Sequence, residues 1–197
     1  MRLGKIVSSY SHLQYRCQIY TRGEVPDPPA PDDYGLGTYV TVPLGDDRSL
    51  VGIVCDTLLH NPEYAVYGPR LSTPEETTVF SPDYLDEART LVSIIAIGYV
   101  DSSGCHHDPP QTAPLLNSEV LRMSPEQVRK FHHADDQVRL GYLPLLIALA
   151  RTTPVMTQTI LRLLTTLEEA FPDGPASTRL RLVRQNLSWQ FRVLSLA

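Results

Sequence analysis

The sequence has very little lysine. Lys5 and Lys130 are the only lysines among the 17 basic residues of the 197-residue chain, and all the others are arginines. Neither lysine lies in the G-x-x-x-x-G-K-[ST] pattern that binds nucleotide phosphates, so the sequence excludes a P-loop motor. The 22 acidic residues give a formal net charge of −5. This charge argues against a protein that is basic over its whole surface, but it allows a local basic patch.

Cysteines and long apolar runs are also scarce. Cys17, Cys55 and Cys105 are an odd number at wide spacing, which provides neither a disulfide framework nor a C-x-x-C pair and favours a reducing compartment. The longest apolar run, 142–150, has about half of the roughly 20 residues that a membrane-spanning helix needs. The N-terminus lacks the apolar core of a signal peptide. We therefore expect a cytoplasmic protein that does not contact a membrane.

Short β-strands are predicted in the first hundred residues. Residues 13–20 alternate between apolar and polar side chains, with the period of two that is typical of a half-buried strand. Residues 50–55 predict a strand buried on both faces, and Gly52 within it indicates a bulge or a bend. Further strands are predicted at 5–9, 38–42 and 91–100. Several short strands separated by turns indicate a small barrel.

The second half of the chain predicts helices. Ser124-Pro125-Glu126-Gln127 has the form of a capping box, and Pro144 indicates a kink or a new helix start. Another helix is expected from 153 to about 170, and Ser177 is the expected N-cap of the last one. The predicted fold class is α+β, with a β-barrel domain at 1–100, a linker at 101–117 and an α-helical domain at 118–197.

The last predicted helix has two apolar faces. At about 100° per residue, one stripe contains Leu180, Val183, Leu187, Phe191 and Leu194. Leu182, Trp189 and Leu196 follow one another at seven-residue spacing on roughly the opposite side, and the charged residues of 176–197 are all arginines. Either a second subunit covers the second face, or the helix is enclosed within its own bundle.

The N-terminal half resembles a known family of barrels. The residues that carry the resemblance are Leu3-Gly4-Lys5-Ile6-Val7, the strand that ends at Tyr20, Gly37-Thr38-Tyr39-Val40 and Val51-Gly52-Ile53-Val54. They are similar to the HAS barrel of HerA and ATP-synthase proteins. Residues 61–63, 68–71 and 80–85 further resemble stand-alone bacterial and cyanobacterial forms without an ATPase domain. The resemblance implies a barrel that assists assembly or docks partners beside a nucleic-acid-processing ATPase. It transfers no catalytic residue to this chain.

Two clusters contain metal-ligating residue types. One is Cys105-His106-His107, and the other is His132-His133 with Asp135 and Asp136. Neighbouring side chains of an extended chain point in opposite directions, so each cluster alone offers few converging ligands. A metal-dependent enzyme would require the two clusters to combine. The sequence contains no G-x-S-x-G nucleophile motif, and we predict no catalytic, cofactor or metal site.

Tyrosines are concentrated in the barrel half, which holds nine of the ten. Tyrosine suits both barrel exteriors and interfaces, because it combines apolar area with a polar tip. The predicted interface residues are Tyr34, Tyr64, Tyr67, Arg70, Tyr84, Leu182, Trp189 and Leu196.

The sequence as a whole predicts a non-enzymatic assembly or adaptor protein that forms a homo-oligomer or docks a protein partner. The alternatives are a direct nucleic-acid binder, with Trp189 stacking on a base between arginines, and the metal-dependent enzyme described above. The negative net charge makes the nucleic-acid binder the less favoured of the two binding functions.

Overall fold

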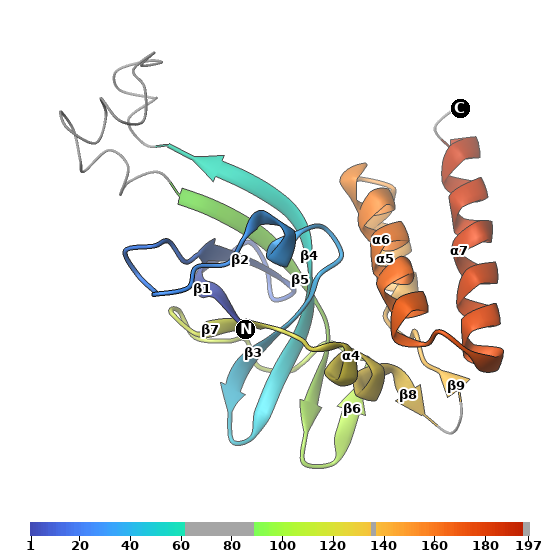
Figure 1. The fold of residues 1–197 in the computed structure, drawn as a ribbon, viewed down its shortest axis with the longest axis horizontal. Coiled ribbons are helices and arrows are strands. Elements are labelled where there is room, and N and C mark those ends of the chain that lie inside the picture. The colour runs from blue at the N-terminus through green and yellow to red at the C-terminus, as the bar shows by residue number, and fades with distance from the viewer. Residues whose placement is uncertain (62–88, 135–136, 195–197) are drawn as a thin grey trace.

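Six antiparallel strands close into a barrel in the computed structural model, which describes residues 1–61, 89–134 and 137–194 (Figure 1). The strand order is β2-β1-β7-β3-β4-β5, and pairing of β2 with β5 closes the ring, while β6 extends the sheet beside β5. The strands are β1 (Arg2–Ser9), β2 (Gln14–Ile19), β3 (Tyr39–Gly45), β4 (Arg48–His60), β5 (Arg89–Asp101), β6 (Gly104–His106) and β7 (Glu119–Arg122). A 3₁₀ helix, η1 (Pro31–Tyr34), lies between β2 and β3.

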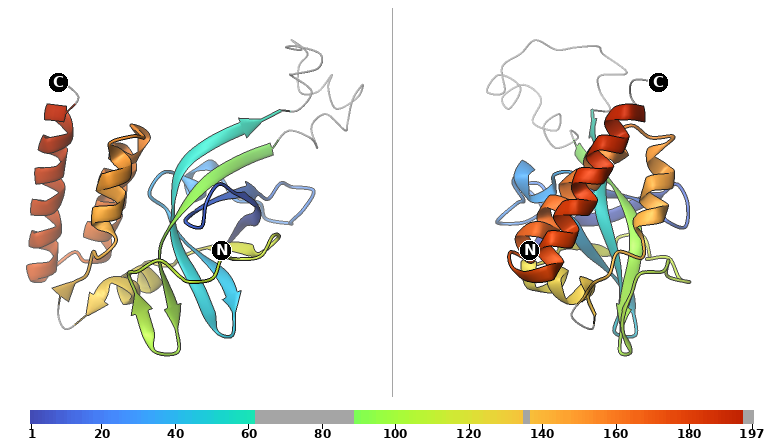
Figure 2. Two further views of the ribbon diagram at one scale, coloured as in Figure 1. Left: turned by 180° about the vertical axis from the view of Figure 1, so that it is seen from behind. Right: turned by 90° about the vertical axis from the view of Figure 1, so that its right-hand side faces the viewer.

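The helices follow the barrel in the sequence and pack against one side of it (Figure 2). They are α4 (Pro125–His132), α5 (Leu143–Ala150), α6 (Val155–Ala170) and α7 (Gly174–Leu194), with a small ribbon of β8 (His133–Ala134) and β9 (Gln137–Val138) after α4. The α+β class and the order of barrel before helices are therefore confirmed. No helix in the described part of the chain is both long enough and apolar enough to cross a membrane.

The sheet continues beyond residue 100, which is the predicted end of the barrel domain. The predicted linker 101–117 contains β6, and the predicted helical region 118–197 begins with β7, which lies between β1 and β3. The sequence missed β7 because its four residues, Glu119–Arg122, are too few to show an alternating pattern. Its partners are strands far away in the sequence, and local patterning does not encode such pairings.

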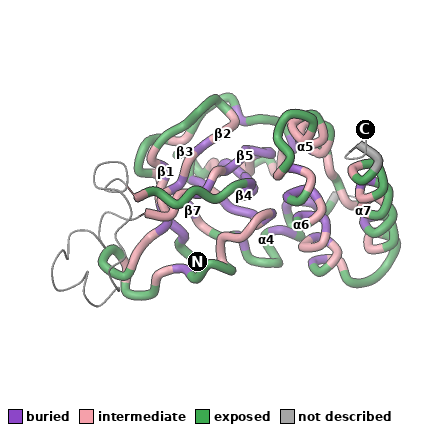
Figure 3. The backbone as a smooth tube through the Cα atoms, turned by 90° about the horizontal axis from the view of Figure 1, so that it is seen from above, coloured by how far each residue is buried: buried purple, intermediate pink, exposed green. Residues whose placement is uncertain are grey.

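Alternate residues of β4 and β5 enter two different cores. Leu50 and Val54 point into the barrel, whereas Val51 and Ile53 point outward into a second core shared with the helices. The same alternation continues on β5, and these two strands are buried over much of their length (Figure 3). The predicted burial of 50–55 on both faces is thus confirmed, and the strand joins the barrel to the helical layer.

Gly52 is required by a close approach between β4 and β5. A Cβ atom at this position would lie 2.6 Å from Cγ2 of Ile94 and 3.0 Å from the carbonyl oxygen of Ile95. The register between the two strands shifts between Val51 and Gly52, so an irregularity lies at the predicted position, but the extra residue is Ile97 of β5. The bulge increases the local bend that closure of a small barrel requires.

Local signals set most helix ends. Ser124 caps α4, since its side chain accepts a hydrogen bond from the Gln127 backbone while the Gln127 side chain accepts one from the Ser124 backbone. Pro144 lies in the first turn of α5 and marks a new start rather than a kink. The predicted cap at Ser177 is wrong, because α7 already begins at Gly174, whose φ of 87° is left-handed.

Candidate functional site

Helix α7 is the element farthest from the barrel, and only one of its faces is covered (Figures 1 and 2). Leu180 and Leu187 are buried in the core that the helices share with the outer face of the barrel, and Val183 and Phe191 pack against that core. These four residues belong to the first apolar stripe that the sequence predicted. Helix α7 therefore packs on α6 through this stripe.

An ion pair fixes α7 on α6. The Arg184 guanidinium donates from Nε to Oε1 of Glu168 over 2.6 Å and from Nη2 to Oε2 over 3.1 Å. Two parallel bonds between a guanidinium and a carboxylate define the mutual orientation of the groups better than a single bond. Arg184 is consequently engaged within the chain.

The outer face of α7 exposes the second stripe. The Leu182 side chain is 59% exposed and the Trp189 side chain is 62% exposed, and both lie about 180° around the helix from Leu180. Leu196, the third predicted member, lies outside the described residues. Exposed tryptophan is unusual, because tryptophan gains more than most residues from leaving water.

Arginines flank this stripe on both sides. Arg181 and Arg179 are exposed and lie about 80° around the helix from Trp189, one on each side. Arg192 is also exposed and contacts the carbonyl oxygen and hydroxyl of Ser188 one turn earlier. Helix α7 contains no acidic residue, so its outer face combines apolar area with positive charge.

The excess of acidic residues that makes the net charge negative lies in another part of the sequence. Segment 62–88 contains six acidic residues and one arginine, so it accounts for the whole formal charge of −5, and the rest of the chain is balanced. Tyr64, Tyr67, Arg70 and Tyr84 of the predicted interface belong to this segment and lie outside the described residues. Tyr34, which was also predicted as an interface residue, lies in η1 and packs against the interior core of the barrel.

The two histidine-containing clusters meet in space, but as parts of the core. The rings of His107 and His132 have centroids 5.5 Å apart, and both are buried. His106 instead turns outward and stacks on Tyr99, with Nε2 3.0 Å from Oδ1 of Asp101. His133 is exposed, and Asp135 and Asp136 lie outside the described residues.

Both ring nitrogens of each buried histidine have a hydrogen-bond partner. His107 Nδ1 accepts from the Gly141 backbone over 3.1 Å, so its Nε2 carries the proton and donates to the Phe131 carbonyl over 3.0 Å. His132 Nδ1 lies 2.7 Å from the Val128 carbonyl, and its Nε2 lies 2.8 Å from the hydroxyl of Tyr142. Burial lowers the pKa of both imidazoles, that of His132 to about 3. Both rings are therefore neutral at pH 7.

A second tyrosine connects this network to the barrel. The hydroxyls of Tyr39 on β3 and Tyr142 lie 3.0 Å apart, and burial raises the pKa of each. The resulting chain of hydrogen bonds runs from β3 through the start of α5 to the end of α4. Nothing local to Tyr39 or Tyr142 in the sequence indicates that the two hydroxyls meet, because the residues are about a hundred positions apart.

The described members of the two clusters do not assemble a metal centre. Within the described ranges, no group of three or more His, Cys, Asp or Glu residues is placed to hold an ion. The Cys105 thiol is half-buried, and its Sγ lies 3.7 Å from the Lys130 carbonyl oxygen. Cys17 and Cys55 are buried as predicted, and burial raises the pKa of each thiol to about 12. A thiol with such a pKa is a poor nucleophile.

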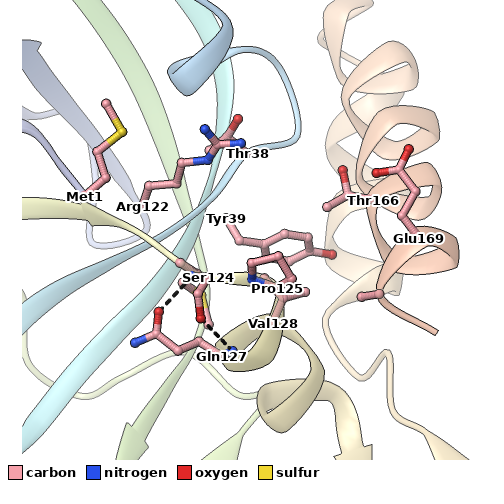
Figure 4. A pocket seen from close by; sticks show the side chains of 12 residues that line it. Met1, Thr38, Tyr39, Arg122, Ser124, Pro125, Gln127, Val128, Thr166 and Glu169 are labelled. Atoms are coloured by element: carbon pink, nitrogen blue, oxygen red, sulfur yellow. Dashed lines mark hydrogen bonds between the residues drawn. The ribbon is translucent and has the colours of Figure 1, made fainter. Parts of the chain in front are cut away.

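An open cavity of about 510 Å³ lies between the barrel, α4 and α6 (Figure 4). Arg122 lines it from the barrel side and Glu169 from α6, while the capping box of Ser124 and Gln127 lies at its edge. The Arg122 guanidinium donates to Asp33 over 2.6 Å, and the capping groups satisfy each other. Arg122, Ser124 and Gln127 are thus engaged in contacts within the fold.

These features define a class of protein: a closed six-stranded barrel, overlaid on one side by helices, that displays an apolar and arginine-bearing outer helix. The chain belongs to the family described as a domain of unknown function, DUF8166, whose model matches residues 1–196. No curated protein matches the sequence.

Proposed function

We propose that this protein is a non-enzymatic assembly module whose copies associate through the outer face of α7. The observation that carries the proposal is the pair of exposed apolar side chains, Leu182 at 59% and Trp189 at 62%, on a helix whose opposite face is buried. The barrel and helices α4 to α6 form the support that holds this face outward.

The energetics of such a face favour association. Full burial of one large apolar side chain stabilises a complex by about 1.5–3 kcal/mol, and tryptophan and arginine are the residue types most often found at interaction hot spots. Arg179 and Arg181 lie on either side of the stripe near Leu182, and Arg192 lies about one turn after Trp189. A central aromatic anchor with a charged rim is the usual anatomy of a protein interface.

The place of the module beside a nucleic-acid-processing ATPase is part of the same proposal. The resemblance of 1–100 to HAS barrels supports it, and so does the closed antiparallel barrel formed largely by these residues. Because residues 1–197 contain no P-loop lysine, they would contribute assembly to such a motor rather than hydrolysis.

Sedimentation velocity over a concentration series tests the assembly function. The wild-type chain should change from monomer to oligomer as its concentration rises, and Trp189→Asp should shift this transition to concentrations about tenfold higher or more. Gln190→Asp is the matched control, because it adds the same charge at the neighbouring exposed position. A wild-type chain that stays monomeric throughout, or equal effects of both variants, would refute the proposal.

Binding of single-stranded nucleic acid is the second candidate, favoured by the exposure of Trp189 between arginines. Stacking on a base would quench the fluorescence of Trp189, the only tryptophan in the chain. Titration with single-stranded oligonucleotides at several salt concentrations separates the two functions. Quenching whose affinity falls linearly with the logarithm of salt supports this candidate, and unchanged fluorescence eliminates it.

A further inference from the structure

The outer face of α7 and segment 62–88 are complementary in charge and in apolar character, and we propose that the segment of one copy binds the α7 face of another. The inference rests on the proposed assembly function and adds the identity of the occupant. It commits to a named part of this same chain, rather than to a second α7 helix or to a different macromolecule.

The charges of the two elements are opposite. Helix α7 carries arginines and no acid, whereas segment 62–88 holds six acids and one arginine, Arg70. The acidic residues are Glu63, Glu75, Glu76, Asp83, Asp86 and Glu87. Complementary charge speeds the encounter of two surfaces and fixes their register.

The same complementarity argues against a contact between two α7 helices. A symmetric dimer would bring together two helices whose only charged residues are arginines, with no acid on either helix to pair with them. Like charges juxtaposed in an interface oppose association. An acidic counterpart removes this repulsion.

The segment also supplies apolar side chains for the exposed stripe. It contains Tyr64, Tyr67, Phe80, Tyr84 and Leu85 among its acidic residues. In the adjoining strand β4, Leu58 is 44% exposed and Leu59 is 79% exposed. Trp189 and Leu182 would therefore find aromatic and aliphatic partners as well as carboxylates to pair with the flanking arginines.

The strand ends that flank the segment in the sequence point to a second copy. The end of β4 and the start of β5 lie on the side of the barrel away from α7, and the helical layer stands beyond the barrel (Figures 1 and 2). Each copy therefore carries an acidic segment that is attached away from its own α7, and one basic helix face. Such unlike surfaces either close by reciprocal exchange or continue as a chain of copies.

Two complementary variants test the inference. Variant A combines Arg179→Glu with Arg181→Glu. It reverses the charge of the α7 outer face but keeps Arg184 paired with Glu168. Variant B replaces the six acids of 62–88 by Gln or Asn. Arg22→Glu with Arg151→Glu is the control for A, because it makes the same charge change at exposed arginines elsewhere. Far-UV circular dichroism checks that each variant is folded.

Sedimentation velocity should show that the dissociation constant of A and that of B are each about tenfold higher than that of wild type, or more. The control should have the dissociation constant of wild type. A mixture of A and B should associate again, because the intact segment of A can bind the intact α7 face of B. Restoration in the mixture is the decisive result, since neither variant contains both halves of a working contact.

Each contrary outcome has its own meaning. If B associates like wild type while Trp189→Asp does not, the assembly function stands and segment 62–88 is not the occupant. If the mixture of A and B associates no more strongly than A or B alone although each is folded, contact between copies through these two elements is refuted. If wild type itself is monomeric at every concentration, the proposed function fails, and this inference fails with it.

Discussion

The hydroxyl of Tyr142 lies 2.8 Å from Nε2 of His132, and both side chains are almost completely buried. Because Nδ1 of the same ring lies 2.7 Å from the Val128 carbonyl oxygen, Nδ1 carries the proton and Nε2 accepts from the hydroxyl. The pair joins the end of α4 to the start of α5, and Tyr39 extends it to the barrel. It is a polar connection between the two layers of the molecule, beside the hydrogen bond from Thr159 of α6 to the Cys55 carbonyl oxygen of β4.

Removal of the Tyr142 hydroxyl should therefore destabilise the protein. Tyr142→Phe leaves Nε2 of His132 buried without its donor, which we expect to lower the free energy of unfolding by about 1–3 kcal/mol. Urea unfolding followed by circular dichroism measures the loss. Tyr34→Phe, at a half-buried position in η1, is the control and should cost less than about 0.5 kcal/mol. Equal costs for the two substitutions would contradict the role assigned to the pair.

Stability should fall as the solution becomes mildly acidic. Burial lowers the pKa of His132 from 6.5 to about 3, so the unfolded chain binds a proton between these values and the folded chain does not. The stabilisation is fully present above pH 6.5 and decreases as pH falls from 6.5 towards 3. From pH 7 to pH 5 this single group should remove about 2 kcal/mol, and His107 acts in the same direction.

Urea unfolding at pH 7, 6 and 5 measures this dependence. The substitution His133→Gln, at the neighbouring exposed position, should leave the slope unchanged. Imidazole nitrogen spectra provide a direct reading, in which the His132 signals should remain those of a neutral ring down to pH 5. Titration of His132 between pH 7 and 5 in the folded protein would disprove the assignment.

Substitution of Gly52 tests the close approach of β4 and β5. Gly52→Ala places a Cβ 2.6 Å from Cγ2 of Ile94 and 3.0 Å from a backbone oxygen, so one strand must shift. We expect a loss of about 1–3 kcal/mol in the free energy of unfolding. At Gly35 a Cβ would have no neighbour within 4 Å, and Gly35→Ala should be close to neutral. If both variants melt at the wild-type temperature, the packing at the bulge is not as tight as described.

The three cysteines should differ in their reaction with a thiol reagent. Cys17 and Cys55 are buried, and burial raises the pKa of each thiol to about 12, whereas Cys105 is half-buried. Ellman's reagent should therefore label Cys105 first in the native protein, with the other two reacting only on unfolding. Cys105→Ser should abolish the early phase. An early phase that persists in this variant would show that a barrel cysteine is accessible.

Several elements could be predicted from the sequence because their signals are local. The alternation in residues 13–20, the β-branched run of 50–55 and the capping box at Ser124 each act within a few residues, and the structure has β2, β4 and α4 there. The first stripe of the last helix was also found, since it depends only on helical spacing. The start of α7 was misplaced because Ser177 and Gly174 are both plausible terminus residues.

Tertiary structure decided what depends on distant partners. The strand β7 completes the barrel only because β1 and β3 lie on either side of it, and no pattern within its four residues indicates this. The histidine clusters illustrate the same limit, because their residue types are those of metal ligands although no metal site was predicted. In the fold, His107 and His132 are core residues held by backbone carbonyls and Tyr142.

The scarcity of lysine and the arginines of the last helix are properties of the sequence alone, and they determined that the chain has no P-loop and that its final helix is basic. Only the tertiary structure decided which apolar stripe of that helix is buried. Packing on α6 covers Leu180 and Leu187 and leaves Leu182 and Trp189 in water. Helical periodicity specifies which residues share a face, but the neighbouring element determines which face is removed from solvent.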